Sequence, residues 1–78
     1  MKPIKLYWRS NCAQCQRMLD FFEEKGIPIE AIDVTYDKEQ FAEMLRLGGI
    51  ATPLLVMGQQ VFHFFDRNKI NRALEELV

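Results

Sequence analysis

The two cysteines of the chain are separated by only two residues, in the stretch Cys12-Ala13-Gln14-Cys15. A short apolar segment over residues 4–8 precedes them, and a helical pattern of apolar residues follows them. A dithiol at a strand-to-helix turn is typical of a redox site, because the first N–H groups and the dipole of the helix favour a thiolate. The spacing and position therefore predict thiol–disulfide exchange.

The two thiols are expected to have different roles. If the helix begins near Cys12, this sulfur lies beside unpaired backbone N–H groups, whereas Cys15 lies one turn further on, on the same face and less exposed. The thiolate is the species that attacks a disulfide, and a second thiol can then displace the product from the mixed disulfide. We predict that Cys12 is the nucleophile and Cys15 the resolving thiol.

Other roles for this pair are weaker. A closed zinc site needs four ligands, and the chain offers two cysteines and a single histidine, His63, so we expect no metal site. A structural disulfide over about four residues would stabilise the fold by only about 2 kcal/mol. Two inert buried thiols remain as an alternative.

Length and composition limit the class of protein. With 78 residues we expect one domain over residues 1–78, and the 49% hydrophobic and 27% charged content is that of a globular chain. A net charge of −1 argues against nucleic-acid binding. No apolar run approaches the roughly 20 residues of a membrane span, and the first residues lack the apolar region of a signal peptide. We therefore expect a cytoplasmic location, where a CxxC pair is more often catalytic than structural.

Apolar periodicity and turn residues predict an α/β domain in the order β-α-β-α-β-β-α. The expected strands cover residues 4–8, 29–34, 54–57 and 60–64, and the expected helices cover residues 12–25, 38–47 and a last segment from residue 67. Because large residues occupy both faces of the first strand, we expect it at the centre of the sheet.

Polar residues that can cap a helix precede each expected helix. Ser10 or Asn11 is expected to cap the first helix, Asp37 with Gln40 resembles a capping box, and Asp66 is expected to cap the last helix. The apolar stripes behind these caps are expected in the core: Phe41, Met44 and Leu45 in the second helix, and Ile70, Ala73, Leu74 and Leu77 in the third.

Three residues near the dithiol allow two interpretations each. Pro53 directly precedes a buried strand, and the segment alone does not decide between a cis bond and an ordinary trans proline at the strand entry. Arg9 and Arg17 each allow a role in holding the thiolate and attracting acidic partners, or a place as solvated surface arginines. We favour the first role for Arg9, and the two fit Arg17 equally well.

The element order, the CxxC after the first strand and the Thr-Pro before the third strand resemble the glutaredoxin-like form of the thioredoxin fold, over essentially the whole chain. This resemblance implies a four-stranded mixed sheet with helices on both faces. Ala51-Thr52-Pro53 matches the family's cis-proline loop, which implies a cis bond beside the dithiol and a preceding residue that binds an incoming disulfide through its backbone. The substrate-binding residues that the resemblance implies are Tyr7, Trp8, Arg9, Thr52, Pro53, Phe64 and Asp66.

The departures from the usual motif point to a subgroup. Most dithiol glutaredoxins carry Pro-Tyr between the cysteines, whereas Ala13-Gln14 is similar to the NrdH-type redoxins, which take electrons from thioredoxin reductase and deliver them to ribonucleotide reductase. The segment from Phe65 to Ile70 also resembles that group. The residues ahead of it differ, because Phe62-His63-Phe64-Phe65 stands where NrdH-type redoxins carry Trp-Ser-Gly-Phe.

The same region bears on the use of glutathione. His63 and Phe64 stand where glutathione-using members carry two glycines, and side chains there would crowd the tripeptide. Arg67 replaces an acidic residue that many of those members use. Phe64 is expected either in the core or on an apolar rim, and His63 either on an exposed strand or beside Cys12 as a titrating neighbour.

These observations together predict a small monomeric dithiol–disulfide oxidoreductase that reduces protein disulfides and needs no cofactor. We expect a thioredoxin-reductase-type flavoenzyme as its electron donor and ribonucleotide reductase as one candidate recipient. Two alternatives stay open. In one, glutathione is the reductant; in the other, Cys12 from two chains and two external thiols hold an iron–sulfur cluster.

Overall fold

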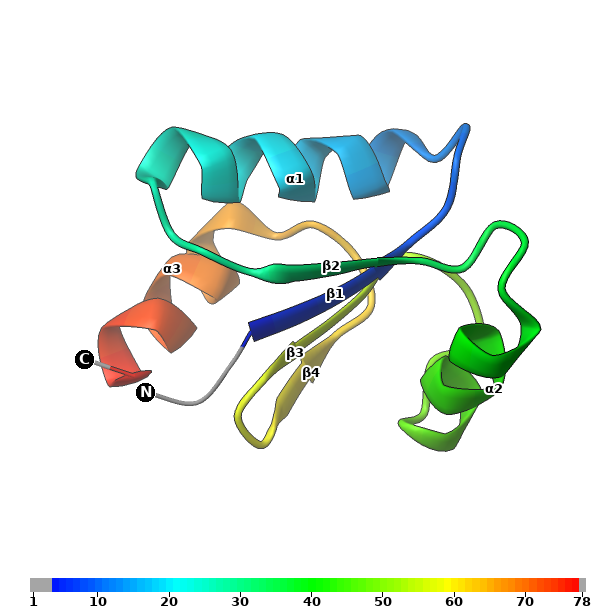
Figure 1. The fold of residues 1–78 in the computed structure, drawn as a ribbon. Helices are drawn as coiled ribbons and strands as arrows, with labels where there is room; N and C mark the ends of the chain where they lie inside the picture. The colour runs from blue at the N-terminus through cyan, green and yellow to red at the C-terminus, as the bar shows by residue number, and fades with distance from the viewer. Residues whose placement is uncertain (1–3, 78) are drawn as a thin grey trace.

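The computed structural model describes residues 4–77, which form one mixed four-stranded sheet and three helices (Figure 1). The elements are β1 (Ile4–Trp8), α1 (Ala13–Lys25), β2 (Glu30–Asp33), α2 (Lys38–Arg46), β3 (Leu54–Met57), β4 (Gln60–Phe62) and α3 (Arg67–Leu77). Helices α1 and α3 cover one face of the sheet, and α2 lies on the other (Figure 1). The expected fold class and element order are thus confirmed.

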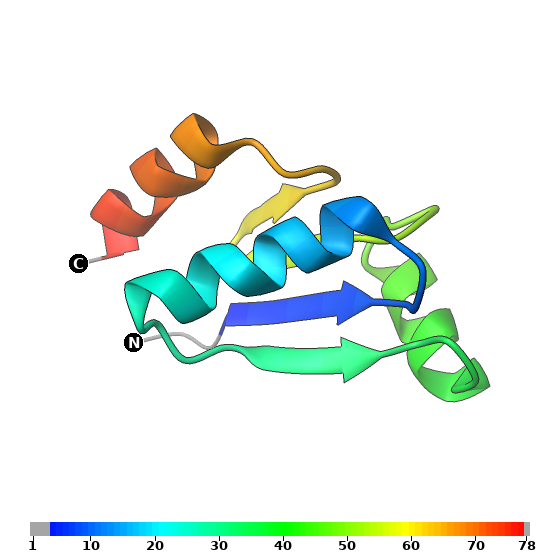
Figure 2. The ribbon, with the colours of Figure 1, turned by 90° about the horizontal axis from the view of Figure 1, so that it is seen from above.

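Strand β1 occupies the interior of the sheet, whose strand order is β2-β1-β3-β4. It pairs in parallel with β2, and the two arrows run in the same direction in Figure 2. It pairs antiparallel with β3, and β3 pairs antiparallel with β4. Ile4 and Leu6 of β1 lie in the core beneath α1 and α3, while Tyr7 lies in the core beneath α2. Because the chain leaves the central strand directly into α1, the dithiol is placed at the end of the sheet where β3 begins.

The two faces of the sheet have cores of different size. The larger one joins β1 and β3 to α1 and α3, and the smaller one is formed by Tyr7, Val34, Met44 and Leu54. Met44 is the one fully buried residue of α2, and the expectation that Phe41 and Leu45 are also core residues is wrong, since both are exposed. A nine-residue helix that crosses a narrow sheet can bury only one side, and these two residues flank that side.

The close packing of α2 on β3 depends on Gly49. A Cβ atom at this position would lie 2.8 Å from Leu54 Cδ2 and 3.2 Å from the carbonyl oxygen of Met44. Both contacts are too short, and the carbonyl belongs to fixed helix backbone. Glycine is therefore required where the chain turns from α2 toward the loop before Pro53.

Strand β4 ends at Phe62, two residues earlier than expected. In the register of this hairpin Leu55 is opposite Phe62, so Phe64 would be opposite Pro53. Proline has no N–H that could donate a hydrogen bond to the opposite strand, so the β3–β4 pairing cannot extend to this position. The chain instead bends away over residues 63–66 toward α3.

Caps account for the helix boundaries. Asp37 accepts a hydrogen bond from the N–H of Gln40 at the start of α2, and Asp66 accepts one from the N–H of Lys69 at the start of α3, as expected. The expected cap of α1 is wrong, because Cys12 itself holds the N-cap position.

Of the apolar residues predicted to form the core face of α3, Ile70 and Ala73 are buried, whereas the side chain of Leu77 lies outside the described part. Within residues 4–77, no helix has the length and apolar content needed to cross a membrane.

Candidate redox site

Cys12 and Cys15 are joined by a disulfide at the N-terminus of α1. Cys12 is the N-cap residue, and its Sγ accepts a hydrogen bond from the backbone N–H of Cys15 at 3.2 Å. Cys12 is partly exposed, whereas only 1% of Cys15 is accessible to solvent. The helix therefore presents one sulfur to the surface, beside a donor that favours its anionic form, and keeps the other within the core.

The loop before β3 reaches the exposed sulfur. The hydroxyl of Thr52 donates to Cys12 Sγ at 3.9 Å, although the two residues are 40 positions apart. The Thr52–Pro53 peptide bond is cis, as the resemblance implied, and Pro53 is buried. The structure thus brings Thr52 and Pro53 to the dithiol.

The turn that carries Cys12 is tied to the loop after β2. The N–H of Ser10 donates to Thr35 Oγ1 at 3.0 Å, and the hydroxyl and the N–H of Thr35 both donate to the carboxylate of Asp33. These two hydrogen bonds lower the pKa of Asp33 below its ordinary value. Asn11, next in the turn, has a left-handed backbone with φ of 59°, which asparagine tolerates better than most residues.

A second long-range hydrogen bond near the dithiol involves Gln14, which lies between the two cysteines. Its side-chain oxygen accepts a hydrogen bond from the backbone N–H of Phe65 at 3.0 Å, across 51 positions of sequence. This contact holds the segment before α3 against the first turn of α1. The sequence identified Gln14 as a subgroup marker but gave no sign of this partner, because the bond is to a backbone group.

Of the aromatic residues before the dithiol, one lines the site and one does not. Trp8 lines a hollow of about 460 Å³ together with both cysteines. Tyr7 is only 1% exposed and belongs to the core under α2, and burial followed by the charges of Glu43 and Glu30 raises its pKa. Tyr7 is therefore a core residue, and the expectation that it contacts substrate is not met.

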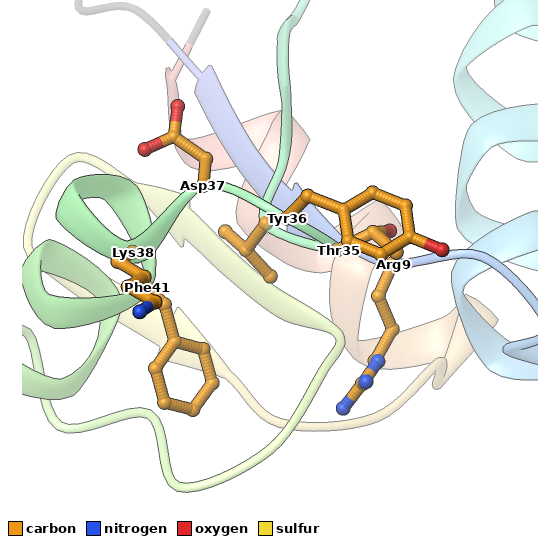
Figure 3. Close-up of a pocket in the computed structure, with 7 residues that line it drawn as sticks. Arg9, Thr35, Tyr36, Asp37, Lys38 and Phe41 are labelled. Carbon is orange, nitrogen blue, oxygen red and sulfur yellow. The ribbon is translucent and has the colours of Figure 1, made fainter.

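Arg9 lies on one side of the dithiol, in a hollow of about 380 Å³ between the turn and α2. Figure 3 shows its guanidinium and the ring of Phe41 in this hollow, while the carboxylate of Asp37 points away from them. Tyr36, whose side chain is 96% exposed, forms part of the rim. A hollow lined by a cation and two aromatic side chains suits a partner that is both acidic and apolar.

Another hollow, of about 490 Å³, is lined by Gly48, Ile50, Ala51, His63 and Phe64. It adjoins Thr52 through Ala51. Phe64 is 67% exposed, which places it on an apolar rim and excludes the core position, and Ile50 is 88% exposed. The sequence did not identify Ile50 as a surface residue, since it opens an apolar run that continues into β3.

Asp66 and Arg67, at the start of α3, make contacts within this helix and with α1. Asp66 caps this helix, and its carboxylate is engaged with the N–H of Lys69 at 3.1 Å. Arg67 pairs with Glu24 at 3.3 Å and lies over the ring of Phe21, so its charge is directed toward α1. Among residues 4–77 there is no cluster of three or more metal-ligating side chains.

Comparisons with known proteins agree with this geometry. The family model described as Glutaredoxin matches residues 4–62. The Gene 56 protein of Mycobacterium phage L5 is 31% identical over 55 residues, which cover 69% of this chain and 53% of that protein. The chain thus spans about half the length of this curated relative.

Solved structures extend the likeness to nearly the whole chain. The glutaredoxin-like protein NrdH-redoxin from Escherichia coli is 30% identical, with a TM-score of 0.76 over 91% of this chain and 93% of that one. The thioredoxin-like protein BC3987 has a TM-score of 0.82 over 90% and 97% of the two chains, and at 22% identity it shows the fold alone. With a dithiol at the start of α1, a cis-proline loop beside it and a family match over most of its length, the chain belongs to the glutaredoxin family.

Proposed function

We propose that this protein is a monomeric cytoplasmic electron carrier that reduces protein disulfides through Cys12 and is recharged by a thioredoxin-reductase-type flavoenzyme. The observation that carries the proposal is the hollow lined by the exposed apolar side chains of Ile50 and Phe64, which adjoins in the chain Thr52, the residue whose hydroxyl contacts Cys12 Sγ. Contiguous apolar surface beside a reactive group suits a protein partner, which can cover it on docking.

The proposed reaction transfers two electrons in two exchanges. The Cys12 thiolate attacks one sulfur of the substrate disulfide, and the other substrate sulfur leaves as a thiolate that takes up a proton. Cys15 then loses its proton and attacks Cys12 Sγ, which releases the second substrate thiol and forms the Cys12–Cys15 disulfide. The N–H of Cys15 and the hydroxyl of Thr52 favour the thiolate of Cys12 both at the start and during its recharging.

Crowding argues for a flavoenzyme donor over glutathione. A small anionic tripeptide needs close approach to the backbone, and the exposed side chains of His63 and Phe64 occupy the region where glycines would allow it. The relative from Escherichia coli is described as a glutaredoxin-like protein with a thioredoxin-like activity profile, and a similar profile in this chain would suit a thioredoxin-reductase-type donor.

The hollow around Arg9 suggests the chemistry of the recipient. Arg9 lines this hollow together with Tyr36 and Phe41, and it is close in sequence to Cys12. We therefore propose recipients that carry acidic and apolar residues next to the reactive disulfide, with ribonucleotide reductase as one candidate.

A side-by-side recharging assay tests the proposal. The oxidised protein is mixed either with NADPH and a thioredoxin reductase or with millimolar glutathione, NADPH and glutathione reductase, and NADPH consumption is followed with insulin as the disulfide substrate. We expect turnover in the first mixture and little in the second. Rapid turnover with glutathione alone would identify an ordinary glutaredoxin. A visible absorption band after anaerobic purification, lost on changing Cys12 to serine, would instead favour a cluster carrier.

A further inference from the structure

The geometry around Gln14 points to a role in selecting the reductant. We propose that Gln14 is a specificity-determining residue, whose side-chain oxygen closes the backbone N–H of Phe65 to small anionic thiols. This inference rests on the proposed function and adds, to the crowding by His63 and Phe64, a further residue that disfavours glutathione at the same site. Its basis is the 3.0 Å hydrogen bond from the N–H of Phe65 to Gln14 Oε1.

The N–H of Phe65 lies just ahead of α3, where backbone donors attract carboxylates. Two donors of the first turn of α3 are already used, since the N–H of Lys69 binds the Asp66 carboxylate and the N–H of Ile70 binds the Asp66 carbonyl. Gln14 Oε1 takes up the donor of Phe65 in the same way. A carboxylate that binds the N–H of Phe65 would therefore have to displace Gln14 Oε1, and near this N–H it would meet the negative end of the Gln14 amide.

The position of this donor relative to the dithiol makes it relevant to a thiol ligand. Gln14 is two residues from Cys12 and lies in the first turn of α1. A tripeptide reaches about 10 Å when extended, so one whose sulfur is at Cys12 Sγ can bring a terminal carboxylate to the segment that Gln14 contacts. The usual Pro-Tyr pair of dithiol glutaredoxins has no side-chain amide oxygen at this place.

The step affected is reduction of the oxidised protein. One glutathione thiolate attacks Cys12 Sγ, and Cys15 leaves as a thiolate that is protonated. A second glutathione thiolate attacks the glutathione sulfur of the mixed disulfide, which releases the thiolate of Cys12 and glutathione disulfide. Two electrons pass from two glutathione molecules to the protein, and Gln14 influences only how well the first one binds.

The test compares Gln14→Met and Gln14→Glu with the unchanged protein. Methionine has a similar length but no strong acceptor, so it frees the N–H, whereas glutamate keeps an acceptor and adds a negative charge. Each oxidised protein is reduced by glutathione and, separately, by glutathione diethyl ester, whose carboxylates are masked. The quantity compared is the rate constant with glutathione divided by the rate constant with the ester. We expect Gln14→Met to raise this ratio about tenfold, which is the effect of gaining one charge-assisted hydrogen bond. Gln14→Glu should lower the ratio below that of the unchanged protein.

Two controls separate this role from a general effect on the fold or on the redox potential. Gln16→Met removes a glutamine amide from the same helix that binds only Asp20, and it should leave the ratio unchanged. Faster amide exchange at Phe65 in Gln14→Met, measured by NMR, should report the lost bond directly. An equal gain with both thiols, or no gain, would overturn the inference, whereas rapid reduction of the unchanged protein by glutathione would overturn the proposed function itself.

Discussion

Cys12 and Cys15 have the same chemistry and opposite surroundings. Cys12 Sγ receives the N–H of Cys15 and the hydroxyl of Thr52 at the surface, while Cys15 is 1% exposed. The sequence alone predicted this difference in surroundings, because the spacing of the two cysteines determines which one begins the helix. It could not predict the Gln14–Phe65 contact or the burial of Tyr7, since both depend on residues that are distant in sequence.

The thiols of the reduced protein are predicted to react in order. Brief treatment with iodoacetamide should label Cys12, and mass mapping of the fragments should find Cys15 unlabelled until the protein is denatured. The physical reason is that only a thiolate that is accessible reacts rapidly, and Cys15 becomes accessible through local unfolding. Labelling of Cys15 ahead of Cys12 in the folded protein would reverse the assignment.

At the scale of elements, the loops at the end of the sheet position the dithiol. The chain of hydrogen bonds from Ser10 through Thr35 to Asp33 joins the turn before α1 to the end of β2. The order of the elements was predictable from periodicity and caps, and their boundaries agree to within a few residues. The early end of β4 was not predicted, because it follows from the position of Pro53 across the hairpin, which is a property of the register.

The Asp33 contacts predict a pH-dependent contribution to stability. The pKa of Asp33 is lowered in the folded protein, so its contribution is fully present above the unfolded pKa of about 3.9 and is lost as the pH falls through the lower folded pKa. Asp33→Asn should therefore lower the melting temperature at pH 7, and its difference from the unchanged protein should shrink below about pH 4.

Circular dichroism melts at pH 7 and pH 3 measure this difference. Glu75→Gln is a suitable control, because it removes an exposed carboxylate from α3, away from the turn. A difference between Asp33→Asn and the unchanged protein that is as large at pH 3 as at pH 7 would rule out the carboxylate as its source.

At the scale of the molecule, the fold gathers three chain segments around one sulfur. The turn before α1, the loop before Pro53 and the segment before α3 are far apart in sequence, and hydrogen bonds from Thr52 and through Gln14 bring them together. The surface they form is largely apolar on one side, around Ile50 and Phe64, and cationic and aromatic on the other, around Arg9. The sequence predicted Phe64 and Arg9 in this surface but not Ile50 or Tyr36, whose exposure depends on how α2 and its flanking loops pack.

Trapping of the mixed disulfide tests most directly whether Cys12 attacks and Cys15 resolves. Reduced Cys15→Ser and Cys12→Ser proteins are each incubated with insulin under the same conditions, and covalent adducts are resolved on a non-reducing gel and mapped by mass spectrometry. Without a resolving thiol, Cys15→Ser should accumulate an adduct through Cys12, while Cys12→Ser should form little or none. An adduct through Cys15 that forms at a comparable rate in Cys12→Ser would contradict the account.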